Sequence, residues 1–445
     1  MTAPTSLRKF FIIWGGQLAS ILGSEMTSFA VTIWAWEATG KATPLALILF
    51  FTRLTRVITA IFGGLIVDRF SRKRIMILSD SAIALSTILL LFLLWAGTLQ
   101  IWHFYLAALV SGIFGYIQGL AYTTTIPLIV PKQHYARANA LRHQVSRFGS
   151  GVIAPALAGG LYPLVGLTGI LLIDLGTFAI AVFSIALIRL PQAPPVETAT
   201  EESLGQKLSF GFRYIFARPS LLAILIFLLS INLVGTAGGA IFSPMILARS
   251  GNNEAVLATV LSATGVGGLL GALILSVWGG PKPRIHGLLS GAALSNGFGM
   301  LVGVLKTPPL WVVASFLESF FSPVMGNSNG AIWMSKVEPG VQGRVFASRF
   351  LIAQITSPLG LAMAGPLADF VFEPAMQPSG ILAGMLGGGF GTGEGSGMAV
   401  QYTLFSLLGS AIGLRPCFAN GLSGYFFPVL RDVEKTVPDY EINSS

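Results

Sequence analysis

Several ionisable residues stand inside apolar stretches that are long enough to cross a membrane. Four of them are the candidates for chemistry: Glu25, Arg53, Asp174 and Glu318. A charged side chain at membrane depth costs on the order of 2.5–3.5 kcal/mol on insertion scales, so such a residue indicates a function by default. A carboxylate that binds and releases a proton beside a fixed cation can link proton movement to a change of conformation. We therefore identify these four as candidate proton-coupling or substrate-binding residues.

Glu25 and Arg53 form the sharpest of these hypotheses. Glu25 lies near the middle of an expected helix over residues 10–36, and Arg53 lies at similar depth in the antiparallel helix expected over 45–67. Each is the nearest candidate partner for the other. The pair would serve either as a proton site beside a cation or as a permanent structural ion pair.

The other two carboxylates are weaker candidates for the proton site. Glu318 lies in the central zone of an expected helix and is the second choice for the proton site. Asp174 lies near an outer helix end, where capping or a gate contact competes with a transport role. Further polar and aromatic residues could line a cavity, although ordinary helix packing explains them equally well: Tyr116, Gln118, Tyr122, Thr123, Asn327 and Asn329.

Composition decides what kind of scaffold positions these residues. The chain has 445 residues, of which 53% are hydrophobic and only 10% are charged, whereas soluble domains carry about 25% charged residues. An all-α membrane protein is therefore expected. Twelve transmembrane helices of about 20 residues would use roughly 240 residues. We expect two six-helix halves over 1–190 and 219–428, a cytoplasmic linker over 191–218 and a cytoplasmic tail over 429–445.

The expected helices follow from the apolar runs and their Gly, Pro and charged interruptions. They cover 10–36, 45–67, 75–97, 104–129, a segment through 151–160, 168–189, 220–246, 254–279, 285–304, 309–334 and 346–371, with a twelfth helix that either ends at Arg415-Pro416 or continues through it. The linker should hold an amphipathic surface helix over 204–217, and a glycine-rich stretch over 380–397 precedes the last helix.

The basic stretch 64–74 must be a tight turn between two membrane helices. Its four cations cannot lie in hydrocarbon, and the positive-inside bias assigns the turn to the cytoplasmic face. Gly64 would let two helices approach closely. Asp68 would serve in a charge pair or at a helix N-terminus, and we expect it to interact with Arg344 of the second half when the cytoplasmic face is closed. Asp80 would belong to the same network at the inner face. The predicted inner gate comprises Gly64, Asp68, Arg69, Arg72, Lys73, Asp80 and Arg344.

An internal repeat supports the two-half organisation. The segment Arg-Ala-Asn-Ala-Leu-Arg at 137–142 recurs 207 residues later as Arg-Val-Phe-Ala-Ser-Arg at 344–349. Both segments begin at the inner end of the fifth expected helix of their half. Parallel repeats of this kind are known in transporter folds.

The sequence lacks the residues that several kinds of chemistry require. Cys417 is the only cysteine, the four histidines show no ligand spacing, and the chain has no phosphate-binding loop. We therefore expect no metal, no cofactor and no enzyme activity. The net charge of +9 is explained by loops that face anionic lipid, so no nucleic-acid partner is expected.

The stretch 64–74 resembles motif A of the major facilitator superfamily, with Ser71 where the motif has glycine. The fifth helix carries Ser150-x-x-x-Ala154-Pro155-x-x-Ala158-Gly159, which is similar to a degraded antiporter signature. Residues 126–131 and 342–347 add to the likeness. Nearly the whole chain looks like a bacterial drug:proton antiporter close to the macrolide-efflux branch.

The resemblance implies a monomeric, multi-pass protein of the bacterial plasma (inner) membrane with both termini in the cytoplasm. It implies multidrug efflux, in which hydrophobic or amphipathic small molecules, drug-like or macrolide-like, are exported by proton antiport with alternating access. Its partners would be that substrate, protons and the lipid bilayer. The alternatives are uptake or flipping of a metabolite or lipid by the same fold, and a non-transporting membrane sensor or scaffold.

Overall fold

The computed structural model describes residues 7–188, 190 and 204–418, and every regular element in these residues is helical. Within these described residues, eleven segments are long and apolar enough to cross a membrane. The longest, Ser146–Leu187, is two helices in one, because the backbone breaks at Gly166 with φ 60° and ψ −169°. Glycine adopts this left-handed region without a Cβ clash. The predicted all-α membrane protein is confirmed, and the break at Gly166 restores the twelfth crossing.

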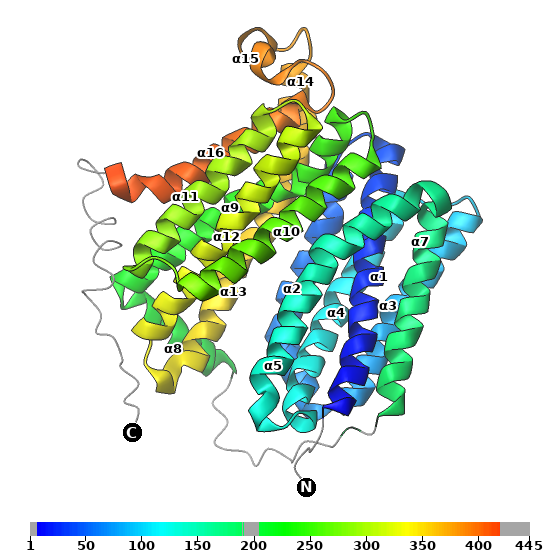
Figure 1. The fold of residues 1–445 in the computed structure, drawn as a ribbon, viewed down its shortest axis with the longest axis vertical. Coiled ribbons are helices and arrows are strands. Elements are labelled where there is room, and N and C mark those ends of the chain that lie inside the picture. The colour runs from blue at the N-terminus through cyan, green and yellow to red at the C-terminus, as the bar shows by residue number, and fades with distance from the viewer. Residues whose placement is uncertain (1–6, 189, 191–203, 419–445) are drawn as a thin grey trace. The chain divides into compact units, whose positions relative to one another are not determined.

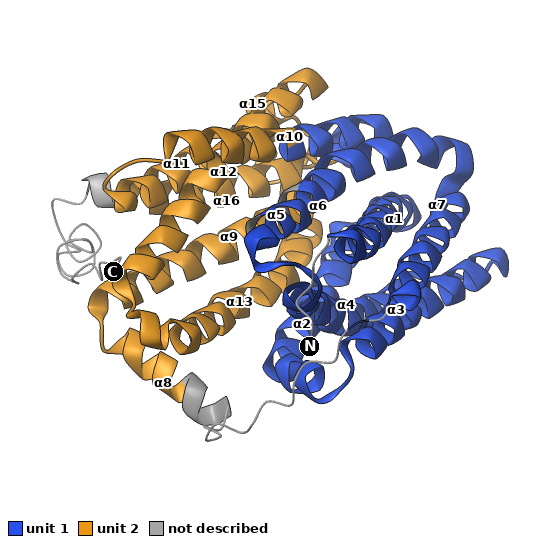
Figure 2. Cartoon of the chain, turned by 60° about the horizontal axis from the view of Figure 1, so that its bottom comes forward, with its two compact units in different colours: residues 1–195, 246–265 blue, residues 196–245, 266–445 orange. Residues whose placement is uncertain are grey.

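The chain forms two compact units (Figure 2), of which unit 1 comprises residues 1–195 and 246–265. Its elements are α1 (Arg8–Thr39), α2 (Ala42–Arg69), α3 (Arg72–Trp95), α4 (Ile101–Ile129), η1 (Lys132–His134), α5 (Tyr135–Ala140), η2 (Leu141–Val145), α6 (Ser146–Phe148), η3 (Gly149–Ile153) and α7 (Ala154–Leu187), with the first part of α10 (Glu254–Trp278). Its core joins α1, α3 and α7 through fully buried side chains such as Phe10, Met76 and Ile185.

Unit 2 comprises residues 196–245 and 266–445. Its elements are α8 (Leu204–Phe216), α9 (Pro219–Arg249), the rest of α10, α11 (Arg284–Val304), α12 (Pro308–Lys336), η4 (Pro339–Val341), α13 (Gln342–Leu367), η5 (Ala368–Phe372), α14 (Glu373–Met376), α15 (Ala383–Phe390) and α16 (Ser396–Phe418). Within this unit, α8 lies at one end, and α14 and α15 lie at the opposite end (Figure 1).

The observed helices extend the expected ones by a few residues, and two expectations are settled by the backbone. The last helix continues through Arg415-Pro416 to Phe418. The linker helix forms over Leu204–Phe216. Tyr214 and Ile215, near its end, are buried in a hydrophobic core cluster of unit 2. This end of α8 therefore packs on unit 2, and the position of the amphipathic helix at the membrane surface stays a prediction.

Two glycines set the contact between α10 and α12, as the Gly-x-x-x-Gly spacing predicts. A Cβ atom at Gly267 would collide with the carbonyl oxygen of Phe316, and one at Gly271 would collide with that of Phe320. Helices in membranes pack by close van der Waals contact, and small residues permit that approach. Residues 267 and 271 therefore have to be glycine for these two backbones to touch.

We expect Gly271→Leu to lower the thermal unfolding temperature of the purified protein. Overpacking a close contact costs typically about 1–3 kcal/mol, and here the obstacle is backbone, which cannot rotate away. The matched control is Gly176→Leu, because Gly176 is exposed and has open space around it. An equal loss of thermal stability in both variants would contradict the assigned contact.

Candidate functional site

Three charged side chains form a cluster on α1 and α2. Glu25, Arg53 and Arg56 are all exposed and lie within electrostatic range of one another, with Tyr116 of α4 also in range of Arg56. Among the described residues, no ion pair within 4 Å joins any of them. The cluster therefore holds one carboxylate and two guanidinium groups without direct contact, which leaves the carboxylate open to a proton or to a ligand.

The structure brings Glu25 and Arg53 into one cluster, without an ion pair within 4 Å among the described residues. Arg56 exerts a larger electrostatic effect on Glu25 than Arg53 does. Arg56 is absent from the predicted site. The spacing of Arg53 and Arg56 is the signal that could have found it, because residues three apart lie on one helix face.

Asp80 ends a chain of buried amide contacts across three helices. The Gln118 side chain of α4 donates to the Gln17 side chain of α1, and Gln17 Nε2 donates to Asp80 Oδ2 of α3 at 3.2 Å. Asp80 and Gln17 are both buried. Asp80 was predicted to belong to the network of the basic turn at the inner face, and its hydrogen bond in the structure is to α1. The carboxyl group thus holds the helices of unit 1 together.

Asp174 of α7 is buried against the same helix that carries Glu25. It accepts hydrogen bonds from Thr27 Oγ1 at 2.9 Å and from Ser24 Oγ at 3.3 Å, both on α1. The neighbouring Gly23 packs directly on Asp174 and Thr177. This segment of α1 therefore has one face bonded to α7 and another that exposes Glu25. These hydrogen bonds of Asp174 favour a structural role over a role in transport.

Glu318 is the corresponding carboxylate of unit 2. The hydroxyl group of Tyr402 on α16 lies 3.1 Å from each of its carboxylate oxygens and donates to them. Ser295 Oγ of α11 donates to its backbone carbonyl at 2.8 Å, and Gly299 packs against the carboxyl group. Glu318 therefore has a polar partner that Glu25 lacks, and it bridges α11, α12 and α16.

Two cations of the basic turn at 64–74 donate hydrogen bonds to backbone carbonyl oxygens of other helices. Lys73 Nζ donates to the carbonyl oxygens of Ala186 at 2.7 Å and Ile188 at 2.8 Å, at the C-terminus of α7. Arg72 Nη1 donates to the Thr124 carbonyl oxygen near the end of α4 at 2.8 Å. Carbonyl groups at a helix C-terminus lack intrahelical donors and carry partial negative charge, so Lys73 stabilises the end of α7.

The remaining residues of the predicted gate divide between the two units. Asp68 and Arg69 are exposed at the end of α2. A Cβ atom at position 64 would meet no described atom within 4 Å, so the predicted close approach at Gly64 is wrong; Gly63, one position earlier, packs on Tyr116 instead. Arg344 belongs to unit 2 and lies over the Phe210 ring of α8 at 4.2 Å.

The six residues predicted to line a cavity have different surroundings in the structure. Tyr122 and Asn329 are buried, with 5% and 8% of their surfaces exposed, so they do not line an open cavity. Thr123 donates to its own helix at the Gly119 carbonyl oxygen. The others are Tyr116 beside the charged cluster, Gln118 in the amide chain and the exposed Asn327.

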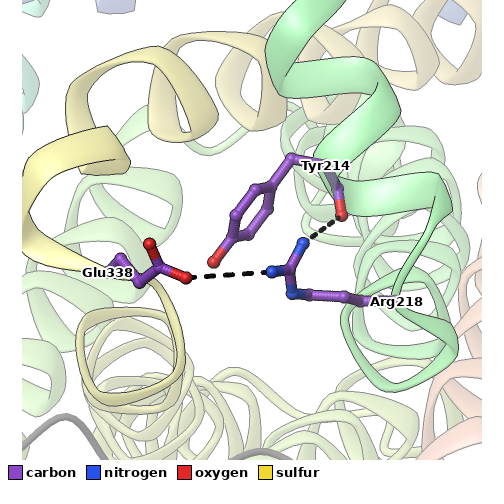
Figure 3. A network of polar contacts seen from close by, with 3 residues as sticks. All are labelled: Tyr214, Arg218 and Glu338. Atoms are coloured by element: carbon purple, nitrogen blue, oxygen red, sulfur yellow. Dashed lines mark hydrogen bonds and ion pairs between the residues drawn. The ribbon is translucent and has the colours of Figure 1, made fainter.

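The linker helix is fixed by a small polar network (Figure 3). Arg218 Nη1 donates to the Tyr214 carbonyl oxygen at 3.3 Å, its guanidinium lies 3.5 Å from the centre of the Tyr214 ring, and Nη2 lies 3.9 Å from Glu338 Oε1. Glu338 immediately precedes η4, between α12 and α13. The network therefore ties the end of α8 to the start of the segment that carries Arg344.

Residues 13–361 match the sequence profile of the Major Facilitator Superfamily, which covers well over half of the chain. The chain belongs to the major facilitator superfamily. The resemblance of its basic turn and fifth helix to that family is thereby confirmed. Members of the superfamily are membrane transporters and not enzymes.

Curated relatives of this major facilitator include drug transporters at low identity. It is 25% identical over 368 residues to macrolide efflux protein A of Streptococcus pyogenes, covering 81% of this chain and 89% of that protein. It is 24% identical over 370 residues to the multidrug efflux pump Tap of Mycolicibacterium fortuitum, covering 80% of this chain and 90% of the relative.

Solved structures confirm the fold. A bacterial homologue of the human lysosomal transporter Spinster matches with a TM-score of 0.67 at 14% identity, over 98% of this chain and all of that one. The nucleoside transporter NupG matches with a TM-score of 0.67 at 13% identity, over 91% of this chain and 97% of the other.

We expect Asp174→Ala to destabilise the protein without abolishing transport by the fraction that folds. Loss of the carboxylate leaves the hydroxyl groups of Ser24 and Thr27 without their acceptor, and an unsatisfied buried polar group costs about 1–3 kcal/mol. Asp174→Asn, which retains one acceptor oxygen, should lose less. The thermal unfolding temperature and the transport rate per folded molecule are measured together. Full stability combined with loss of transport would show that Asp174 acts in transport itself.

Proposed function

We propose that this protein is a secondary active transporter that exports hydrophobic or amphipathic small molecules in exchange for protons. The observation that carries the proposal is the cluster of Glu25, Arg53 and Arg56. Glu25 is exposed and has no ion-pair partner within 4 Å in the described residues, whereas Asp80, Asp174 and Glu318 each accept hydrogen bonds from a neighbouring helix. The named functions of the efflux relatives support the substrate class.

The proposed mechanism uses the charge balance of this cluster. With Glu25 ionised, its attraction to Arg53 and Arg56 favours the conformer that keeps α1 and α2 in their present relation. Protonation removes that attraction, so the two guanidinium groups repel each other without compensation. Glu25 therefore has a different proton affinity in each of the alternative conformers. This difference is the condition for a proton to shift the populations of the conformers. Alternating access would follow from movement of one six-helix half against the other.

Glu318 is the second candidate for the proton. Its hydrogen bonds from Tyr402 give the ionised carboxylate a donor, and its backbone carbonyl is held by Ser295. These contacts restrain α11, α12 and α16 around one carboxyl group. In the proposed mechanism Glu318 positions these helices, and Glu25 exchanges the proton.

The remaining parts of the proposal concern the membrane, the oligomeric state and the orientation of the protein. We infer a bacterial plasma-membrane protein that acts as a monomer, with both termini in the cytoplasm and the basic turn at 64–74 on that face. The halves would extend over 1–190 and 219–428, and the positive-inside rule supports the orientation.

We expect Glu25→Gln to abolish uphill transport while leaving substrate binding intact. Glutamine keeps the size of the side chain but cannot release a proton. The assay is uptake of a fluorescent drug into inverted membrane vesicles whose lumen is acidified, with and without a protonophore. The matched control is Glu37→Gln, because Glu37 is an exposed carboxylate on the same helix whose partner is the Tyr162 hydroxyl group. The control variant should transport as the unmodified protein does.

Two outcomes would contradict this assignment. Uptake by the unmodified protein that persists after the proton gradient collapses, with no other ion gradient imposed, would exclude proton coupling. Full uphill transport by Glu25→Gln, together with its loss in Glu318→Gln, would move the proton site to Glu318.

A separate prediction concerns the inner gate, where we propose that Asp68 interacts with Arg344 when the cytoplasmic face is closed. Asp68→Asn should shift the population toward the inward-open conformer and slow turnover. Coupling free energies between such sites are typically about 1–3 kcal/mol. A double-mutant cycle of Asp68→Asn and Arg344→Ala, read by transport rate and by spin-label distance across the cytoplasmic face, should show non-additive effects. Strict additivity would exclude the pair.

A further inference from the structure

The four arginines of the internal repeat make a matching set of contacts. In unit 1, Arg137 lies over the Phe11 ring at 5.9 Å and Arg142 over the Tyr122 ring at 5.6 Å. In unit 2, Arg344 lies over the Phe210 ring at 4.2 Å and Arg349 over the Trp333 ring at 4.9 Å. A guanidinium within about 6 Å of a ring centre is attracted to the ring face. Both arginines of each repeated segment therefore lie over aromatic rings, although the rings themselves are not related by the 207-residue offset.

The two positions of each repeat have different surroundings. Phe11 begins the first helix of unit 1 and Phe210 lies on α8, which leads into the first full helix of unit 2, so Arg137 and Arg344 hold the leading segments of their units. Arg142 and Arg349 instead pack on the fourth long helix of their unit, α4 or α12.

Arg142 and Arg349 are left with uncommitted hydrogen-bond donors. Both are half-buried, and among the described residues neither makes a hydrogen bond or an ion pair. A guanidinium carries five N–H donors in a rigid planar fork that matches the two oxygens of a carboxylate or phosphate. A cation held on an aromatic face keeps the edges of this fork available, and a half-buried position strengthens its attraction for an anion.

The aromatic partners carry unused donors as well. Tyr122 Oη is buried without a hydrogen-bond partner beneath Arg142, and Trp333 Nε1 is buried without one beneath Arg349. Buried polar groups in folded proteins are nearly always paired, so each such atom needs an explanation. In addition, Arg142 lies in η2, a π-helical turn, and π-helical turns are frequent at functional sites.

We propose that Arg142 and Arg349 are two oxyanion-binding positions, one in each unit, that hold the carboxylate or phosphate group of an amphipathic compound. The guanidinium fork supplies the charge and the paired donors, and the ring beneath it supplies both orientation and one further O–H or N–H donor after a small adjustment. The inference does not depend on the direction or the coupling of transport. Binding can therefore be tested even if proton-driven export fails.

The test measures the stoichiometry of binding of radiolabelled octyl phosphate to the purified full-length protein in a neutral maltoside detergent. We expect two molecules bound by the unmodified protein, one by Arg142→Gln or Arg349→Gln, and none by the double variant. Arg147→Gln is the matched control, because Arg147 is an exposed arginine close to Arg142 in the chain and should not affect binding. Lysine at either position keeps the charge without the fork, so the dissociation constant should rise at least about tenfold while the protein still folds.

Competing ligands distinguish the source of the oxyanion. Competition by phosphatidylglycerol and not by phosphatidylcholine would identify a lipid headgroup as the ligand, and equal competition by inorganic phosphate would identify a bare oxyanion site. Equal binding to the double variant, or equal competition by octyltrimethylammonium, would overturn the proposal.

Discussion

The cost of an unsatisfied polar group in hydrocarbon governs the internal organisation of both units. A buried carboxyl group in this environment is stabilised by a donor on another helix, because hydrocarbon offers no hydrogen bonds. Asp174 accepts from two hydroxyl groups of α1, Asp80 from Gln17, and Glu318 from Tyr402. These contacts also decide which helices are neighbours, so the polar residues of this apolar protein carry much of its specificity.

Glu25, Arg53 and Arg56 are the exception to this pattern. Their charges face the open side of α1 and α2, and they influence one another without a direct ion pair in the described residues. A tight ion pair would fix one protonation state and one conformer, whereas charges held apart can respond to a proton. The same helix fixes its opposite face to α7 through Ser24 and Thr27. α1 is therefore fixed to α7 on one face, and on another face it carries the carboxylate that can respond to a proton.

Much of the fold could be predicted from the sequence, because apolar runs of membrane length and a basic turn leave few alternatives. The arginines of the repeat at 137–142 and 344–349 all lie over aromatic rings. The site was harder to predict, since residue counting gives the depth of Glu25 and Arg53 but not their rotation about the helix axis. Tyr122 and Asn329 show the same limit, for a polar side chain in a helix can face a cavity or a neighbour. No local pattern reveals that Tyr214 and Ile215 of α8 join a core cluster with residues of other helices.

The central claim is that Glu25 is the carboxyl group that gains and loses the proton. Infrared difference spectroscopy of the reconstituted protein, recorded across a pH titration, observes the C=O stretch of a protonated carboxyl group directly. Against the bands of the other carboxyl groups, we expect one pH-dependent band that the unmodified protein and Glu318→Gln share and that is missing from Glu25→Gln. A titrating band that persists in Glu25→Gln and vanishes in Glu318→Gln would contradict the claim.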